Sequence, residues 1–382
     1  MNASQEMVKK LESVELDFSW PDFPVVLREA VGARVADTLY AGLGSAGAAW
    51  YALDLQASDK QWQRRADFPG VAPAGAAFAT LQGKIFVFGG NAPQSLGGRP
   101  MQSDSVWCYE TQADVWQCLP LTLPLGLLGA SAIAVSENRI WIFGGYNKQQ
   151  FDRFFVEHES ASEDRRKELL QEFMGRPIAG FAWNRHVWEF NADDSSLRCL
   201  SEVPHAPNCG AGLLALDGGL MLLSGEVKPG LRSATVKRAR FTSGGLVWDA
   251  ELPLPVPPGE ACNEGLAAGF FGNAKTAAVF AGGTNFIGAT QNYLEGKYYA
   301  HAGLKKRWRD EIYIWNSDSG SWQLAAHLPK PRAHGLSFEL DQGLLLVGGD
   351  GQDGSPLQET CLLSFQWDAG HNTGKFNNKE MK

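Results

Sequence analysis

The sequence lacks the residue spacings that mark the common metal, redox and nucleotide sites. Its six cysteines are scattered, and no two of them have the C-x2-C spacing typical of zinc or redox centres. No Walker loop, H-E-x-x-H, G-x-S-x-G or calcium-loop pattern occurs either. We therefore expect no metal, no cofactor, and thiols that are mostly buried.

Basic charge and long apolar runs are scarce as well. The chain has 34 Lys and Arg residues against 42 Asp and Glu residues, a net charge of −8, whereas binding to a phosphate backbone relies on a basic face. No apolar run reaches the roughly 18 residues of a membrane span, and the N-terminal stretch MNASQEMVKKLESVELDFSW has no apolar core of a secretion signal. We expect neither nucleic acid nor a membrane as a partner and, on the sequence as given, a cytoplasmic location.

Glycine, in contrast, recurs in a regular pattern. One unit repeats along the chain: an apolar run that ends in a glycine pair, a polar loop, an aromatic strand, and then Trp and Pro. Periods of about 40 to 50 residues are typical of propeller and kelch repeats. The pairs or near-pairs are Gly42/Gly44, Gly89/Gly90, Gly144/Gly145, Ser224/Gly225, Gly282/Gly283 and Gly348/Gly349. Six units predict an all-β fold, a six-bladed kelch-type β-propeller, in which Trp62, Trp116, Trp248 and Trp322 pack between blades.

The last unit has no Trp-to-Pro segment of its own. The N-terminal segment 15–24, ELDFSWPDFP, repeats the order of strand, Trp and Pro seen in 61–69. We predict that this segment is the outer strand of the last blade and closes the ring, which removes two exposed sheet edges. The propeller then spans 15–367, between an N-terminal extension, 1–14, and a polar tail, 368–382.

Two repeats are too long for bare blades. The first insertion, about 150–182, interleaves charged and apolar residues in a helical pattern, and the second, about 284–310, is rich in aromatic, amide and basic residues. Both leave a blade directly after its glycine pair. We therefore expect both insertions to cap the same face of the ring and to form its binding apparatus.

Charged residues follow the fourth inner strand at once, in the segment SGEVKPGLR. Glu226 is placed at the channel mouth, where a carboxylate can act as a general acid or base. The planar fork of Arg232 suits the capture of a substrate carboxylate, and Lys228 lies between the two. The alternative is a structural Glu–Arg ion pair that holds the loop.

Other polar residues are weaker candidates. His301 is either a proton relay or a packing residue of its loop. Arg332 is expected to start the innermost strand of the last blade near the channel and to contact a ligand there. Asn285 and Asn292 are either ligands for sugar hydroxyls or solvated loop residues.

Four longer strings are more specific than the glycine pairs. They are FPVVLREAVGA, YAGLGSAGAAWYALDLQASDKQW, SGEVKPGLR and NYLEGKYYAHAGLKK. With them the chain resembles the bacterial N-acetylneuraminate epimerases, sialic acid mutarotases built on a kelch propeller, over roughly 23–365. The resemblance implies an isomerase that interconverts the α and β anomers of this acidic sugar without a cofactor, and it carries the expectation of a homodimer.

The resemblance also implies roles for individual residues. The family's proton acceptor is the glutamate of the G-E-x-K-P-G-L-R segment, which falls on Glu226 here, and the arginine of that segment falls on Arg232. We expect Glu226 to take the anomeric proton and Arg232 to hold the sugar carboxylate. His301, Lys228 or a water molecule then returns a proton to the ring oxygen.

The sequence departs from the family pattern in two places. Family members are usually exported to the periplasm with a cleaved signal, so a start further upstream would make this chain periplasmic. Residues 68–78, FPGVAPAGAAF, replace a stretch that carries an arginine in the family, which predicts one substrate contact fewer on that side. The remaining alternative is a non-catalytic kelch propeller that binds a sugar or a peptide at the channel mouth.

Overall fold

Four-stranded antiparallel sheets repeat along the chain in the computed structural model, which describes residues 11–93, 100–216, 218–243, 245–274, 277–317 and 319–367. Six such sheets, the blades, occur within these residues. From the first strand of each sheet to its last, the blades are β2 (Val31–Val35), β3 (Thr38–Gly42), β4 (Trp50–Asp54), β5 (Gln63–Arg64); β6 (Ala77–Leu81), β7 (Lys84–Phe88), β10 (Ser105–Glu110), β11 (Val115–Thr122); β12 (Ser131–Ser136), β13 (Arg139–Phe143), β14 (His186–Asn191), β15 (Ser196–Glu202); β16 (Gly212–Leu216), β17 (Gly219–Leu223), β20 (Thr235–Thr242), β21 (Gly245–Trp248), with β22 (Leu252–Pro253) also on β20; β23 (Phe270–Ala274), β24 (Ala277–Ala281), β27 (Glu311–Asn316), β28 (Ser321–His327); and β30 (Leu336–Leu340), β31 (Gly343–Val347), β33 (Thr360–Trp367), β1 (Leu11–Asp17).

The first strands of the blades form a closed ring. Strand β2 contacts β6, and the contacts continue through β12, β16, β23 and β30 back to β2. These strands therefore surround the central channel, and the predicted six-bladed propeller is confirmed. The apolar core lies between neighbouring blades, as the predicted tryptophan packing requires: Trp116 of the second blade is 5.1 Å, centroid to centroid, from Trp50 of the first.

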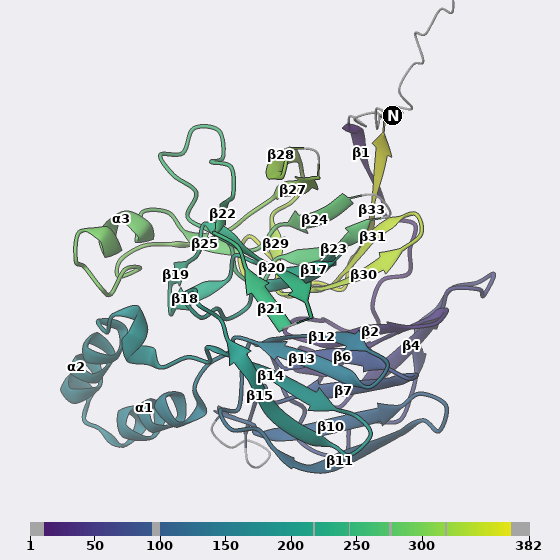
Figure 1. Ribbon diagram of the computed structural model, residues 1–382, viewed down its shortest axis with the longest axis horizontal. Coiled ribbons are helices and arrows are strands. Elements are labelled where there is room, and N and C mark those ends of the chain that lie inside the picture. The colour runs from purple at the N-terminus through teal and green to yellow at the C-terminus, as the bar shows by residue number, and fades with distance from the viewer. Residues whose placement is uncertain are drawn as a thin grey trace, which may run out of the picture.

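The N-terminal strand completes the last blade, as predicted, although it lies earlier in the chain. Strand β1 pairs with β33, with Val14 opposite Phe365 and Leu16 opposite Leu363, and the two run side by side in Figure 1. The strand ends at Asp17 because its carboxylate accepts the Ser19 N–H at 2.8 Å, a turn that leaves the sheet. Residues 11–14, predicted as extension, thus belong to the strand, while residues 1–10 and the tail 368–382 lie outside the described residues.

The two insertions lie on one side of the molecule, at the left of Figure 1. The first contains α1 (Lys148–Ser160), α2 (Glu163–Met174) and the 3-10 turn η2 (Ile178–Phe181), and the second contains β25 (Thr284–Phe286), α3 (Ala289–Leu294) and β26 (Lys306–Trp308). Both pack on the hairpin β18 (Glu226–Lys228) and β19 (Leu231–Arg232) through a shared apolar cluster. The predicted cap on one face is confirmed. The remaining short elements are η1 (Gly44–Ala46), β8 (Asn91–Pro93), β9 (Pro100–Gln102), β29 (Arg332–Ala333) and β32 (Asp350–Gly351).

Both residues of five of the six pairs adopt the left-handed conformation. At Gly282, with φ 63°, a Cβ would lie 2.4 Å from the Arg332 carbonyl oxygen of the next blade, and the N–H of Gly283 donates to the same oxygen at 2.9 Å. Only a residue without a side chain permits this approach. In the first blade the left-handed pair is Leu43 and Gly44 rather than Gly42 and Gly44, because Gly42 still belongs to β3.

Six backbone hydrogen bonds form a second closed ring at the channel mouth. The N–H of each residue donates to the carbonyl of the next, at 2.8–2.9 Å, and every residue has a left-handed φ between 50° and 68°. We call these residues the mouth ring; in order of donation they are Glu29, His334, Ala268, Gly210, Gly129, Gly75 and again Glu29. Each one precedes the first strand of a different blade, so the ring ties all six blades together.

The cysteines depart from the expectation of buried thiols. Cys108, Cys209 and Cys361 are buried, whereas Cys118 and Cys199 are exposed, and all six are free. In the part of the chain that the structure describes, no helix combines the length and the apolar character needed to cross a membrane.

The close approach at the glycine pairs predicts a specific cost for substitution. Gly282→Ala should lower the free energy of unfolding by about 3 kcal/mol, because the backbone of two blades must move apart. Gly320→Ala is the matched control: its φ is 62°, but nothing lies within 4 Å of the added Cβ, so only the left-handed strain of about 1 kcal/mol remains. Urea unfolding measures both, and equal losses would refute the steric account.

Candidate active site

A cavity of about 510 Å³ opens at the mouth ring, a volume typical of small-molecule sites. All six mouth-ring residues line it, together with apolar residues of the first strands such as Phe78, Leu213 and Phe271. Polar side chains reach it from several blades. They are Asn91, Ser131, Tyr146, Glu226, Arg232, Thr284, Lys306 and Ser337, besides Glu29 and His334 of the ring.

A repeated backbone contact places one set of these polar residues. The residue directly after the left-handed pair, which we call the post-pair residue, bonds through its backbone to the residue just before a mouth-ring position. Glu226 pairs in this way with Cys209, next to Gly210, with N···O distances of 2.8 Å in both directions. The same contact recurs at Asn91, Tyr146, Thr284 and Asp350. Ser45, directly after the pair Leu43 and Gly44, donates its N–H to the carbonyl of Arg28 at 3.1 Å, so the fold brings six post-pair residues to the channel mouth.

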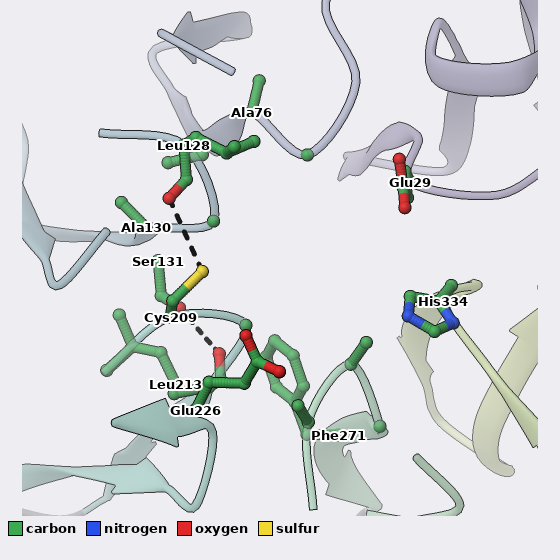
Figure 2. Close-up of a pocket in the computed structure, with 18 of the residues that line it drawn as sticks. Glu29, Ala76, Leu128, Ala130, Ser131, Cys209, Leu213, Glu226, Phe271 and His334 are labelled. Carbon is green, nitrogen blue, oxygen red and sulfur yellow. Dashed lines mark hydrogen bonds between the residues drawn. The ribbon is translucent and has the colours of Figure 1, made fainter. Parts of the chain in front are cut away.

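Three donors hold the carboxylate of Glu226. Its Oε1 lies 2.9 Å from Nη2 of Arg232 and accepts the Gly230 N–H at 3.3 Å, while its Oε2 accepts the Tyr146 hydroxyl at 3.1 Å. Burial and the adjacent Glu226 carboxylate raise the pKa of Tyr146 well above its ordinary value, so its hydroxyl remains a donor. Figure 2 shows the Glu226 side chain at the cavity, near Cys209 and Phe271.

Arg232 has unused hydrogen-bonding capacity in the cavity wall. One nitrogen binds Glu226, but Nε and Nη1 are buried and have no hydrogen-bond partner among the described residues. The guanidinium lies 4.7 Å from the ring centroid of Phe286, which supports its planar face. The ion pair that the sequence left as an alternative is present, and it leaves two donors for an anionic ligand.

The ammonium group of Lys228 binds backbone carbonyls of the two insertions that form the cap. Its ammonium donates to the carbonyl of Met174 at 2.8 Å, of Arg176 at 2.5 Å and of Tyr298. These carbonyls belong to both insertions, so one buried side chain fastens the two together. Burial lowers the pKa of Lys228 to about 8, but with all three donors occupied, the structure gives its candidate role as proton donor no support.

His301 packs beside the turn between β18 and β19 rather than among the residues that line the cavity. Its ring lies 4.9 Å from Phe286 and 5.0 Å from Tyr299, and it occupies the space that a Cβ on Gly230 would need. Burial, reinforced by the charge of Arg232, lowers its pKa below the ordinary value, so the ring is neutral at pH 7. This placement favours the packing alternative.

The three remaining candidates lie in the walls. The Arg332 guanidinium donates to the carbonyls of Gly348 at 2.5 Å and Glu359 at 2.9 Å, so the expected ligand contact is not supported. Asn285 donates to the Gly265 carbonyl and Asn292 to the Ala300 carbonyl. None of the three is among the residues that line the cavity, and the donors named here bind backbone carbonyls, while Oδ1 of Asn285 and Nε of Arg332 are buried without a partner among the described residues.

The sequence analysis did not predict several residues that line the cavity. For some of them a signal was available in the sequence. Tyr146 follows its glycine pair as Glu226 does, so the same reasoning applied to every repeat would have selected it. Lys306 lies at the end of the string NYLEGKYYAHAGLKK. Glu29 lies in the string FPVVLREAVGA, whereas His334 lies in none of the four strings and carries no such signal.

Comparisons with known proteins agree on one family. The family model NANM, described as N-acetylneuraminate epimerase, matches residues 20–371. The chain is 38% identical over 355 residues to the N-acetylneuraminate epimerase of Brucella melitensis biotype 1, covering 91% of this chain and 90% of that protein. It is 38% identical over 357 residues to that of Vibrio cholerae serotype O1, covering 92% of each.

A solved structure supports the same grouping. The structure described as "Structure of YjhT" superposes with a TM-score of 0.84 at 31% sequence identity. The match covers 91% of this chain and 99% of that chain, so the two propellers share nearly their whole architecture.

The fastening role of Lys228 predicts a local effect. Lys228→Met leaves three buried carbonyls without their donor and should lower the free energy of unfolding by about 3 kcal/mol, with amide protection lost first in 148–181 and 284–308. Lys167→Met is the control, since Lys167 on α2 pairs with exposed Glu163 and such surface pairs contribute little. Equal hydrogen exchange in the two variants would contradict this role.

Proposed function

The chain belongs to the N-acetylneuraminate epimerase family, and we propose that it interconverts the α and β anomers of N-acetylneuraminate with Glu226 as proton acceptor. The family membership makes the chain an isomerase of this acidic sugar. The observation that supports the role of Glu226 is its carboxylate, which lines the cavity beside an arginine that retains two unpartnered donors.

Mutarotation needs only proton transfers at the anomeric hydroxyl and the ring oxygen of the sugar. A proton leaves the anomeric hydroxyl, the bond between the anomeric carbon and the ring oxygen breaks, and the open-chain ketone then closes from its other face. No atom changes oxidation state over the full cycle. A positioned carboxylate within hydrogen-bond reach of the anomeric hydroxyl provides the base, which typically contributes about 100-fold to 10,000-fold in rate.

The surroundings of Glu226 suit this task. The Tyr146 hydroxyl and the Gly230 N–H fix the orientation of the carboxylate through hydrogen bonds to its two oxygens. A fixed orientation saves the entropy of placing the base at the moment of reaction. Both contacts come from the fold itself, since Tyr146 is a post-pair residue and Gly230 is in the turn between β18 and β19.

Arg232 supplies the recognition of the acid group. A buried donor without a partner costs about 1 to 3 kcal/mol, and Nε and Nη1 of Arg232 carry this cost in the free protein. The carboxylate of N-acetylneuraminate accepts a charge-assisted hydrogen bond from this guanidinium, through Nη1, since Nε and Nη1 point to different edges of the group and one carboxylate cannot bind both. Its binding places the neighbouring anomeric centre next to Glu226, because Arg232 contacts Glu226 at 2.9 Å.

The first test removes the base. Glu226→Gln keeps the shape of the side chain but replaces one accepting oxygen by an NH2 group and cannot take a proton, so we expect the catalysed anomer exchange to fall by at least about 100-fold. Exchange rates from NMR on freshly dissolved single-anomer sugar measure this.

The matched control is Glu189→Gln. The buried carboxylate of Glu189 also forms an ion pair with an arginine, Arg198, at 2.6 Å. Glu189 does not line the cavity, so Glu189→Gln should retain the wild-type rate. An undiminished rate in Glu226→Gln would remove Glu226 from the role. A wild-type protein that binds the sugar without accelerating exchange would be a lectin and would contradict the proposed function.

A second test weakens the support of the base. Tyr146→Phe removes one hydrogen bond to a charged group, worth about 1.5 kcal/mol, and should lower kcat about tenfold. Tyr109→Phe is the control, because the Tyr109 hydroxyl also binds a carboxylate, Asp114 at 2.6 Å, yet does not line the cavity. Equal kcat values in the two variants would show that Tyr146 does not orient Glu226.

A further inference from the structure

His334 combines a strained backbone with a place at the cavity. It belongs to the mouth ring, with φ 59°, and its side chain lines the cavity. Three of the six ring positions are glycine, which adopts this conformation without cost, whereas a residue with a Cβ loses about 1 to 2 kcal/mol there. Strain of this kind persists mainly at functional sites.

A buried aspartate orients the imidazole of His334. Nδ1 of His334 lies 2.8 Å from Oδ1 of Asp350, a post-pair residue, and the indole N–H of Trp308 donates to the same oxygen at 2.9 Å. Burial alone would raise the pKa of Asp350, but the hydrogen bonds from His334 and Trp308 and the charge of Lys306 outweigh it and lower the pKa. Asp350 is therefore an acceptor, so Nδ1 carries a hydrogen and Nε2 is the nitrogen left for a ligand.

His334 and Glu226 reach the cavity from different parts of the ring. Glu226 follows the second strand of the fourth blade, while His334 precedes the first strand of the sixth. In Figure 2 His334 lies with Glu29 on the side of the pocket away from Glu226. A sugar bound between them therefore meets an oriented imidazole and an oriented carboxylate on two of its sides.

We propose that His334, held by Asp350, is the second proton-transfer group of the mutarotation, which donates to and accepts from the ring oxygen of the sugar. This inference rests on the proposed function and on the role of Glu226. His301 and Lys228 do not compete for this role, because His301 does not line the cavity and the donors of Lys228 are all occupied.

The proton inventory balances over one cycle. Glu226 takes the anomeric proton while the bond from the anomeric carbon to the ring oxygen breaks, and the Nε2–H of the His334 imidazolium protonates that oxygen as it leaves. After rotation of the open-chain ketone, neutral His334 takes the hydroxyl proton back as the oxygen attacks the other face. Protonated Glu226 then returns its proton to the new anomeric oxygen, and the enzyme regains its starting state.

The test replaces His334 by glycine, the residue that the mouth ring already carries at three positions. We expect kcat to fall by at least about 100-fold, the affinity for N-acetylneuraminate to change by less than about threefold, and added imidazole to restore part of the rate. The control is His327→Gly, because His327 also pairs with an aspartate, Asp310 at 2.9 Å, but lies outside the cavity lining. The control should retain the wild-type kcat.

Asp350→Asn tests the positioning role. It should lower kcat in the wild-type background and have no further effect on top of His334→Gly, since a residue that acts through His334 has nothing left to orient. Additive losses would make Asp350 merely structural.

The outcomes separate this inference from the function on which it rests. A His334→Gly variant within about threefold of the wild-type kcat, while Glu226→Gln is inactive, would overturn the role of His334 alone. Loss of rate without imidazole rescue in His334→Gly, together with an active His334→Asn variant, would also overturn it. A wild-type protein without any acceleration would instead overturn the proposed function.

Discussion

A closed ring of six backbone hydrogen bonds at the channel mouth is the constraint on which the rest of the structure depends. Each blade contributes one residue in the left-handed conformation, and each N–H finds its acceptor in the neighbouring blade. Because the ring is closed, the mouth residues keep their positions relative to one another. The residues just ahead of the ring pair with the post-pair residues, so the same constraint places Glu226, Tyr146 and Asp350. Chemistry is thereby placed on rigid backbone rather than on loop tips.

The charged side chains near the mouth ring have different buried partners. The ion pair between Glu226 and Arg232 uses one guanidinium nitrogen and leaves two donors for an acid group. Lys228, only two residues after Glu226, points into the cap and binds three carbonyls of both insertions. Glu226 and Lys228 of the same short hairpin thus have different roles, since one side of the hairpin faces the cavity and the other supports the cap. The second polar group, His334 with Asp350, faces the same cavity from another blade.

Residue types that repeat in phase could be predicted from the sequence, and contacts with backbone atoms could not. The glycine pairs predicted six blades because they recur six times in phase along the chain, and Glu226 was predicted from its place after such a pair. Lys228 was predicted as a possible proton donor from its place in the segment SGEVKPGLR. In the structure its acceptors are carbonyls more than 50 residues away, which no side-chain pattern reveals. Arg332 was predicted to contact a ligand from its place at the start of an innermost strand near the channel, and His334 was not considered. The hydrogen bonds that hold the Arg332 guanidinium in the wall of the channel also go to backbone oxygens.

The central claim is that one cavity holds the acid group on Arg232 and the anomeric centre between Glu226 and His334. A crystal structure of the Glu226→Gln variant with bound N-acetylneuraminate tests it most directly. The account predicts the sugar carboxylate within hydrogen-bond distance of the Arg232 guanidinium, at Nη1, and the ring oxygen within reach of Nε2 of His334. A sugar bound outside the mouth ring, or one whose carboxylate lies away from Arg232, would contradict it.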